Sequence, residues 1–166
     1  MAFAYYDRLS SRDKATYRKS DAVQTVRLPR AAALWSLVQE LRAALGAGER
    51  PEIQRFSQQL ADGLTERFGV AGVRVQVLAV RPSRNWGELH GLYTTEEGRA
   101  PLIQVWMKTA HHKRVVAFRT FLRTLLHELG HHLDFTLLKL PDSFHTEGFF
   151  KRESSLFRQL VPPTER

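Results

Sequence analysis

Residues 127–131 read His-Glu-Leu-Gly-His and stand inside a long apolar run. On a helix, residues four apart share one face with Cβ atoms about 5–6 Å apart, so the imidazoles of His127 and His131 can converge on one Zn²⁺ ion. Glu128 projects about 100° around the helix from His127, where its carboxylate can reach a water molecule in the open position of the metal. The spacing therefore predicts a zinc site with His127 and His131 as ligands and Glu128 as the catalytic base.

A third ligand must come from outside the motif, because a catalytic zinc site normally has three protein ligands and leaves one position for water. His145 follows the motif beyond a loop at Pro141, from which the chain can fold back onto the motif helix. Glu147 and Glu153 belong to the last predicted helix, and Asp134 lies on the motif helix itself. One straight helix rarely wraps three ligands around one ion, which weighs against Asp134. The spacing favours His145 and keeps the three acidic residues as alternatives.

The reaction that these parts predict is hydrolysis of an amide, with peptide bonds as the expected substrates. Glu128 would take a proton from the zinc-activated water and pass it to the leaving amine. The oxyanion that forms on the carbonyl needs a further hydrogen-bond donor. The sequence offers three candidates for this donor and does not choose among them: Tyr93, His90 and Arg152.

For the other histidines we expect positions in the core, on a strand or at the surface. His132 points about 100° away from His131 on a helix, so we expect it to pack at the edge of the core or to lie at the surface. His111 and His112 fall in a predicted loop and are expected to be solvated. His90 falls on a predicted strand, where it either packs or approaches a substrate.

Periodic patterns place these side chains on a few elements. Apolar residues three or four apart predict helices, and alternating apolar residues bounded by turn residues predict strands. The predicted helices span 31–45, 51–68, 113–138 and 147–161, and the predicted strands span 73–77, 88–94 and 101–107. Residues 81–87 are expected to form a turn-rich connection. Gly130 costs the motif helix about 1 kcal/mol relative to Ala, which predicts that another segment passes close to it.

This order of elements predicts a single α+β domain with N-terminal helices, a small mixed or antiparallel sheet, the motif helix and a C-terminal helix. The length of 166 residues is enough to bury one core without disulfides. Residues 1–29 are predicted to form a basic N-terminal extension with a weak helical period, which Tyr5, Tyr6 and Tyr17 can anchor to the body.

Charge is unevenly distributed along the chain. Lys and Arg number 25 against 17 Asp and Glu, which gives a formal net charge of +8. Basic residues gather in the segment 99–123, which has no acidic residue and leads directly into the motif. A solvated surface accounts for such a segment, and so does contact with nucleic acid or with an acidic substrate.

Cysteine content and hydrophobicity limit where the protein is expected to work. With no cysteine, the chain has no disulfide, zinc ribbon or thiol nucleophile, which fits a reducing compartment. No apolar run reaches the roughly 18 residues of a membrane helix, and residues 1–8 lack the basic start and apolar core of a signal peptide. We therefore expect a cytoplasmic protein without a membrane partner.

The segment 88–160 resembles the zincin metallopeptidases, and among them the small intracellular SprT-like and WLM families. The resemblance rests on the motif at 127–131 and on residues 145–152, which read His-Thr-Glu-Gly-Phe-Phe-Lys-Arg. In those families a histidine followed closely by an aromatic residue opens a helix and supplies the third zinc ligand. His145 and Phe149 match this arrangement, so the resemblance implies that His145 completes the ligand set.

The resemblance further implies a zincin-like metallopeptidase domain at 30–166, with the strands in 89–106 similar to the zincin edge strands that line a substrate. Some family members are proteases that act on proteins bound or crosslinked to DNA, which the basic segment 99–123 would suit. SprT-like proteins often carry a cysteine zinc ribbon, which this chain lacks. The alternative function is a nucleic-acid-associated or regulatory binding protein that uses a zincin fold with a structural or degenerate metal site.

Overall fold

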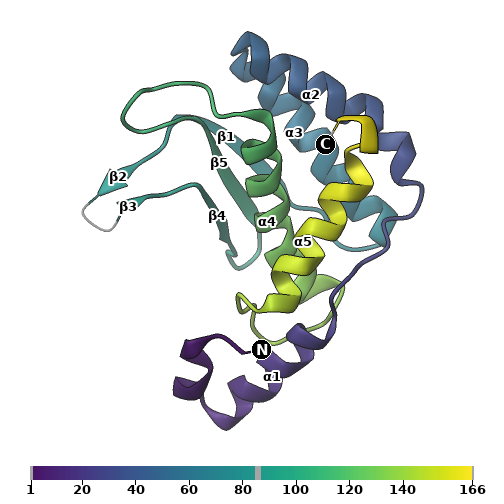
Figure 1. Cartoon of the computed structure of the whole chain (residues 1–166), viewed down its shortest axis with the longest axis vertical. Helices are drawn as coiled ribbons and strands as arrows, with labels where there is room; N and C mark the ends of the chain where they lie inside the picture. Colours follow the sequence, from purple (N-terminus) through teal and green to yellow (C-terminus); the bar gives the residue numbers. More distant parts are fainter. Residues whose placement is uncertain (1, 85–86, 166) are drawn as a thin grey trace.

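A small mixed sheet and the helices beside it form an α+β fold, as the sequence predicts (Figure 1). The computed structural model describes residues 2–84 and 87–165. Within these residues the α-helices are α1 (Ser11–Ala22), α2 (Trp35–Ala47), α3 (Arg50–Phe68), α4 (Phe118–Thr136) and α5 (Glu147–Leu160). The strands are β1 (Arg74–Val80), β2 (Ser83–Arg84), β3 (Gly87–Glu88), β4 (Gly91–Thr94) and β5 (Leu102–Lys108). Three short 3₁₀ turns are η1 (Ala4–Arg8), η2 (Ala31–Leu34) and η3 (Pro163–Glu165).

The main sheet has the strand order β1-β5-β4, so β1 and β4 are its two edges. Strand β1 runs parallel to β5, with Val75 opposite Ile103. Strand β4 runs antiparallel to β5, with Gly91 opposite Val105. The sheet is therefore mixed, and the strands predicted at 88–94 and 101–107 contribute its antiparallel pair, β4 and β5.

Two glutamines of α3 satisfy the outer backbone groups of edge strand β1. The amide oxygens of Gln58 and Gln54 accept from the N–H groups of Val75 and Val77, both at 2.7 Å. Their amide nitrogens donate to the carbonyls of Val73 and Val75 at 3.0 and 2.8 Å. In the part of the chain that the structure describes, no strand pairs with the outer edge of β4. The outer edge of β1 is thus bonded by glutamines of α3, whereas the outer edge of β4 has no pairing strand among the described residues.

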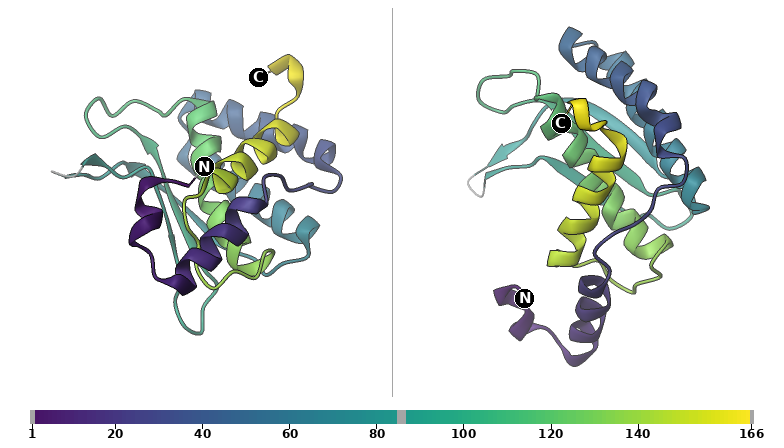
Figure 2. Two further views of the ribbon diagram at one scale, coloured as in Figure 1. Left: turned by 60° about the horizontal axis from the view of Figure 1, so that its bottom comes forward. Right: turned by 45° about the vertical axis from the view of Figure 1, so that its right-hand side comes forward.

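The core lies between the sheet and the helices. Helix α3 packs on β1, and α4 packs across β4 and β5 with α5 against its other side (Figures 1 and 2). Alternate residues of β5 are buried in this core, as period-two packing requires: Ile103, Val105 and Met107. Helix α4 contributes an apolar stripe to the same core: Phe121, Leu122, Leu125, Leu126 and Leu129. Because that stripe faces inward, the neighbouring face of α4, which carries the motif histidines, reaches the surface beside β4.

The helix predicted at 113–138 begins only at Phe118. Residues 109–117 instead turn back along the end of β5, with a bridge between Lys108 and Val115 and a hydrogen bond from the Val116 N–H to the Met107 carbonyl at 2.7 Å. Val116 is buried there, so its apolar character serves the loop and not a helix. The apolar pattern that predicts α4 therefore continues into the preceding loop, where Val116 is buried without being helical.

The connection expected at 81–87 contains two very short strands, β2 and β3, which pair with Ser83 opposite Glu88. Asn85 and Trp86, which belong to that predicted turn, lie outside the described residues. The strand predicted at 88–94 is accordingly divided between β3 and β4.

The N-terminal residues form helix α1, which packs against the N-terminal part of α5 (Figure 2). Only Thr16, Tyr17 and Ser20 of α1 are buried, and two of these are polar, which accounts for the weak apolar period of this segment. The Tyr17 ring is 1% exposed and contacts the rings of Tyr5 and Tyr6 at centroid distances of 5.7 and 5.0 Å. Among the helices of the described residues, none has the length and apolar character needed to cross a membrane.

Candidate metal centre

Three histidines meet beside strand β4. His127 and His131 lie on successive turns of α4, and His145 lies in the loop before α5. Nε2 of His145 is 3.1 Å from Nε2 of His127 and 3.0 Å from Nε2 of His131. All three ligand atoms lie within 4.8 Å of one another. Zinc–nitrogen bonds are about 2.0–2.1 Å long, so one ion can reach three nitrogens at these separations.

Each motif histidine has an outer hydrogen-bond partner that fixes its tautomer. Nδ1 of His127 donates to the carboxylate of Glu153 at 2.9 Å. Nδ1 of His131 lies 2.7 Å from Oγ of Ser143, which itself donates to Oδ2 of Asp134 at 2.7 Å. Because the Ser143 hydroxyl gives its single proton to Asp134, it accepts from the Nδ1–H of His131. In its neutral form, each of these two rings therefore carries a lone pair on Nε2, the atom that faces the cluster.

Burial favours the neutral form of His131 and His145, which is the form of imidazole that binds a metal. Burial, with smaller contributions from His127 and His145, lowers the pKa of His131 to about 3. Burial also lowers the pKa of His145, with His127 acting in the same direction and Glu153 opposing it. Imidazole nitrogens that present lone pairs to one point are a donor set that suits Zn²⁺. The chemistry of these side chains therefore fits a zinc ion.

The three acidic residues considered as third ligands lie elsewhere. Glu153 contacts His127 from outside the cluster, and its other oxygen is 3.7 Å from Nη1 of Arg123. Asp134 is buried and bonded to Ser143, while Glu147 pairs with a lysine one turn along α5. The candidate ligand group therefore consists of the two motif histidines and His145, and includes none of these carboxylates.

The ring of Phe149 packs against all three histidines of the cluster. Its ring is 1% exposed and lies 4.9, 4.8 and 5.3 Å from the rings of His127, His131 and His145. A Cβ atom built on Gly130 would lie only 3.1 Å from this ring. The segment expected to pass close to Gly130 is therefore the first turn of α5, and the absence of a side chain at 130 lets Phe149 reach the histidines.

Glu128 lies at the junction of two open grooves. The first groove, of about 480 Å³, extends toward the start of α4 and includes His90, Thr120 and Thr124. The second groove, of about 370 Å³, extends the other way and includes Leu92 and Phe135. Glu128, His127 and Gly91 line both grooves.

The environment of Glu128 suits a proton carrier. Its side chain is largely buried, and this burial raises its pKa to about 7. Glu153 acts in the same direction, whereas His127 opposes the shift. A group with a pKa near the working pH both accepts and releases a proton readily. Sequence spacing located this carboxylate, but only the fold shows how strongly it is desolvated.

The three candidate oxyanion donors have different surroundings. Nε2 of His132 donates to the carbonyl of Ala71 at 2.7 Å, so its Nδ1 accepts from the Tyr93 hydroxyl at 3.0 Å. Tyr93 therefore gives its proton to the interior of the protein, although its ring lines the second groove. Arg152 is buried, with its guanidinium bonded to other protein groups. His90 is exposed and lines the first groove.

The remaining histidines and basic residues are placed as follows. His132 is fully buried and has a packing and hydrogen-bonding role. His111 and His112 are exposed in the loop before α4, as expected. Arg119 and Arg123 of the basic segment lie on α4, with guanidinium carbons 5.4 and 4.3 Å from the Phe157 ring centroid.

Sequence reasoning did not find Ser143, which links His131 to a buried carboxylate. A serine in an irregular loop carries no periodic signal, so no pattern in the sequence could have located it. Neither a protein-family model, nor a curated protein, nor a solved structure matches the chain. The site is therefore interpreted from its own geometry and chemistry.

Proposed function

We propose that this protein is a zinc-dependent metallopeptidase, with His127, His131 and His145 as zinc ligands and Glu128 as the general base. The observation that carries the proposal is the position of a buried glutamate, next to three converging imidazole nitrogens, at the junction of two open grooves. A closed structural zinc site needs neither a base nor an approach for substrate. The zincin resemblance of the motif and of residues 145–152 supports the same function.

Glu128, Glu153 and Ser143 would have different roles in peptide hydrolysis. Bound zinc would supply the Lewis acidity that activates a water molecule and polarises a carbonyl. Glu128 would accept a proton from that water and then deliver it to the nitrogen of the leaving amine. The pKa of about 7 suits both steps, because the carboxyl group is available in both protonation states near neutral pH. Glu153 and Ser143 would hold the two motif imidazoles in the orientation that presents Nε2.

An extended peptide is the substrate shape that the surroundings favour. An extended segment can add to the outer edge of a sheet by backbone hydrogen bonds, with its alternate side chains entering pockets. Edge strand β4 lies directly beside Glu128, whereas Gln54 and Gln58 already bond the outer edge of β1. The two grooves, which meet at Glu128, would accept substrate side chains on opposite sides of the cleaved bond.

The experiment that tests this function compares wild type with Glu128→Gln on unfolded casein and on a mixture of fluorogenic peptides, each enzyme loaded with zinc. We expect turnover to fall by about 10²–10⁴-fold while zinc content stays the same, because the amide cannot take the proton. Glu97→Gln, at an exposed site in the β4–β5 turn, is the matched control and should keep full activity. Unchanged turnover in Glu128→Gln would show that Glu128 is not the general base.

A nucleic-acid-associated binding protein on the same fold is the second candidate, and one observation favours it. The loop before α4 exposes four consecutive residues that are basic or can become so, namely His111, His112, Lys113 and Arg114. Such a surface attracts phosphate groups without reading sequence. The two candidates are compatible, since a peptidase of the cytoplasm could use this loop to reach proteins bound to DNA. The absence of cysteine favours that reducing compartment.

A further inference from the structure

The N-terminal segment 2–23, which comprises η1, α1 and the residues around them, contacts the loop that carries His145. The hydroxyl of Tyr5 donates to the backbone carbonyl of His145 at 2.6 Å. The ring of Phe3 meets the ring of Phe150 edge to face, with centroids 6.2 Å apart. Phe150 in turn stacks on the imidazole of His145 at 5.7 Å. Tyr5 therefore lies directly against His145, and Phe3 reaches this histidine through Phe150.

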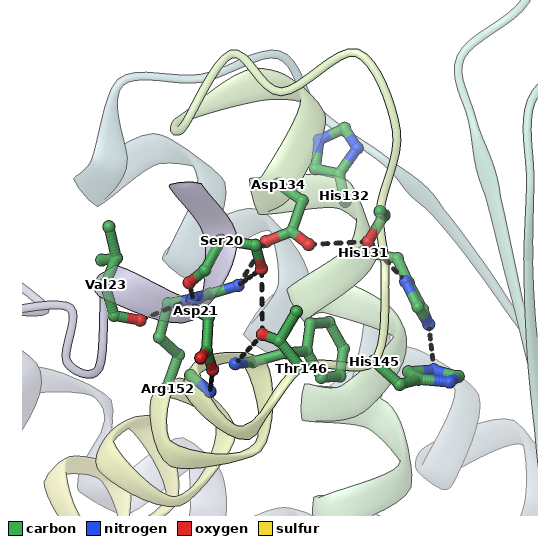
Figure 3. Close-up of polar contacts among 12 residues, drawn as sticks. Ser20, Asp21, Val23, His131, His132, Asp134, His145, Thr146 and Arg152 are labelled. Carbon is green, nitrogen blue, oxygen red and sulfur yellow. Dashed lines mark hydrogen bonds and ion pairs between the residues drawn. The ribbon is translucent and has the colours of Figure 1, made fainter. Parts of the chain in front are cut away.

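The end of α1 holds the start of α5, just after that histidine (Figure 3). Oδ1 of Asp21 accepts from the Gly148 N–H at 2.9 Å, and Oγ of Ser20 lies 3.1 Å from Oγ1 of Thr146, the N-cap residue of α5. A Cβ atom on Gly148 would lie 2.5 Å from the Asp21 carbonyl oxygen and 2.7 Å from that of Ser20. Glycine at 148 is thus required for the two helices to approach this closely.

Arg152 connects the same end of α1 to the motif helix (Figure 3). Its side chain is buried, and Nη1 donates to the carbonyls of Ser20 and Val23, both at 2.5 Å. Nη2 donates to Oγ of Ser20 and to Oδ1 of Asp134, both at 3.0 Å. The other oxygen of Asp134 accepts from Ser143, the hydrogen-bond partner of His131.

These contacts form two continuous connections from segment 2–23 to the metal centre. One runs from Ser20 through Arg152, Asp134 and Ser143 to Nδ1 of His131. The other runs through Tyr5 to the backbone of His145, with Asp21 and Ser20 holding the turn that follows it. Outer partners of this kind orient metal ligands, and their loss typically weakens metal binding by about 10–100-fold.

We propose that segment 2–23 is a positioning element of the metal centre, and that its contacts with Arg152, with the His145 carbonyl and with the start of α5 set the affinity for zinc. Residues that are far from the motif in the sequence would then control whether the three imidazoles hold the ion. This inference rests on the zinc-binding part of the proposed function and does not require peptidase activity.

Three pairs of substitutions test the proposal in the full-length protein. Tyr5→Phe removes only the hydroxyl that reaches His145, while Tyr6→Phe removes a hydroxyl that bonds Arg18 within the segment. Asp21→Ala removes the acceptor for Gly148, while Asp21→Asn keeps an oxygen there. Ser143→Ala breaks the connection to His131, while Ser143→Thr keeps the hydroxyl.

The readouts are the zinc dissociation constant, from competition with a chromogenic chelator, and the visible absorption spectrum of the Co²⁺-substituted protein. We expect Tyr5→Phe, Asp21→Ala and Ser143→Ala to bind zinc about 10–100-fold more weakly and to change the Co²⁺ spectrum. The control Tyr6→Phe and the conservative variants Asp21→Asn and Ser143→Thr should match wild type in both readouts. Circular dichroism of each metal-free variant shows that a loss of zinc affinity is not a loss of fold.

Wild-type zinc affinity in folded Tyr5→Phe and Asp21→Ala would overturn the proposal. If wild type cleaves peptides and these variants bind zinc normally, this inference alone fails. If wild type binds zinc but cleaves nothing, the peptidase function fails, and weaker zinc binding by the variants still supports the inference. A wild type that binds no zinc overturns both.

Discussion

Gly91 of β4 faces Glu128 of α4 so closely that a Cβ atom at position 91 would lie 2.8 Å from Oε1 of the glutamate and 2.8 Å from Cγ2 of Thr124. The base of the proposed reaction is therefore held between its own helix and the backbone of the strand where a peptide would bind. A side chain at 91 must displace either the carboxylate or the strand.

Gly91→Ala should accordingly reduce activity without removing the metal. A displacement of about 1 Å at a reacting group can cost about 10²-fold in rate, and we expect a loss of kcat of this order. Zinc content should stay at the wild-type value, since the three atoms nearest to the new methyl group belong to Glu128 and Thr124 and not to a zinc ligand. Gly72→Ala is the matched control, because a Cβ atom there meets nothing within 4 Å. Equal activity in the two variants would show that the approach of β4 does not position Glu128.

Gly130→Ala should weaken both stability and zinc binding. The new methyl group would press on Phe149, whose ring lies against the three imidazoles. Overpacking costs about 1–3 kcal/mol, which exceeds the gain of about 1 kcal/mol in helix propensity. Gly46→Ala, in an open position on α2, should instead stabilise the protein by about 0.5–1 kcal/mol. Urea unfolding and zinc competition measure both effects, and a stabilised Gly130→Ala would contradict the role given to Phe149.

Removal of zinc should leave the fold intact. The buried apolar cluster that joins the sheet to α2, α3, α4 and α5 does not include the three histidines. Chelation should therefore preserve the far-ultraviolet circular dichroism, while added zinc at 100 times its dissociation constant should stabilise the folded state by about 2.7 kcal/mol. A large loss of helical signal on chelation would instead indicate a structural zinc site.

Binding to single-stranded DNA should depend on salt if the loop before α4 is a nucleic-acid surface. Each phosphate contact contributes about 0.7 to the slope of log affinity against log salt concentration for single strands. Lys113→Ser with Arg114→Ser should lower that slope, whereas Arg12→Ala with Lys19→Ala, which removes the same charge from exposed positions on α1, should not. Salt-independent binding, or equal slopes in both double variants, would exclude this surface.

Much of the fold could be predicted because its elements follow the periods of their buried faces. Helices α3 and α5 begin and end within a residue of their predicted limits, since each has a regular apolar stripe ended by a capping or turn residue. The predicted start of α4 at residue 113 is too early because Val115 continues the apolar pattern of the helix while it packs in the preceding loop. Sequence periodicity does not distinguish these two ways of burying valine.

In the site, too, local spacing predicts some residues, whereas others depend on contacts between distant segments. The motif places His127, Glu128 and His131 on one helix because the spacing alone determines their faces. The roles of Glu153 and Ser143 depend instead on how the loop at 138–146 and helix α5 fold back on α4, which no local pattern encodes. Long-range contacts of α1 are hidden for the same reason, because the buried face of that helix is largely polar.

The most direct test of the central claim is the zinc content of purified protein after mild chelation, for wild type, His145→Ala and His112→Ala. We predict one zinc per chain in wild type and in His112→Ala, whose histidine is exposed in the loop before α4. His145→Ala should lose the metal while keeping its helical circular dichroism. A folded wild type that takes up no zinc, or a His145→Ala protein that keeps it, would contradict the three-histidine metal centre.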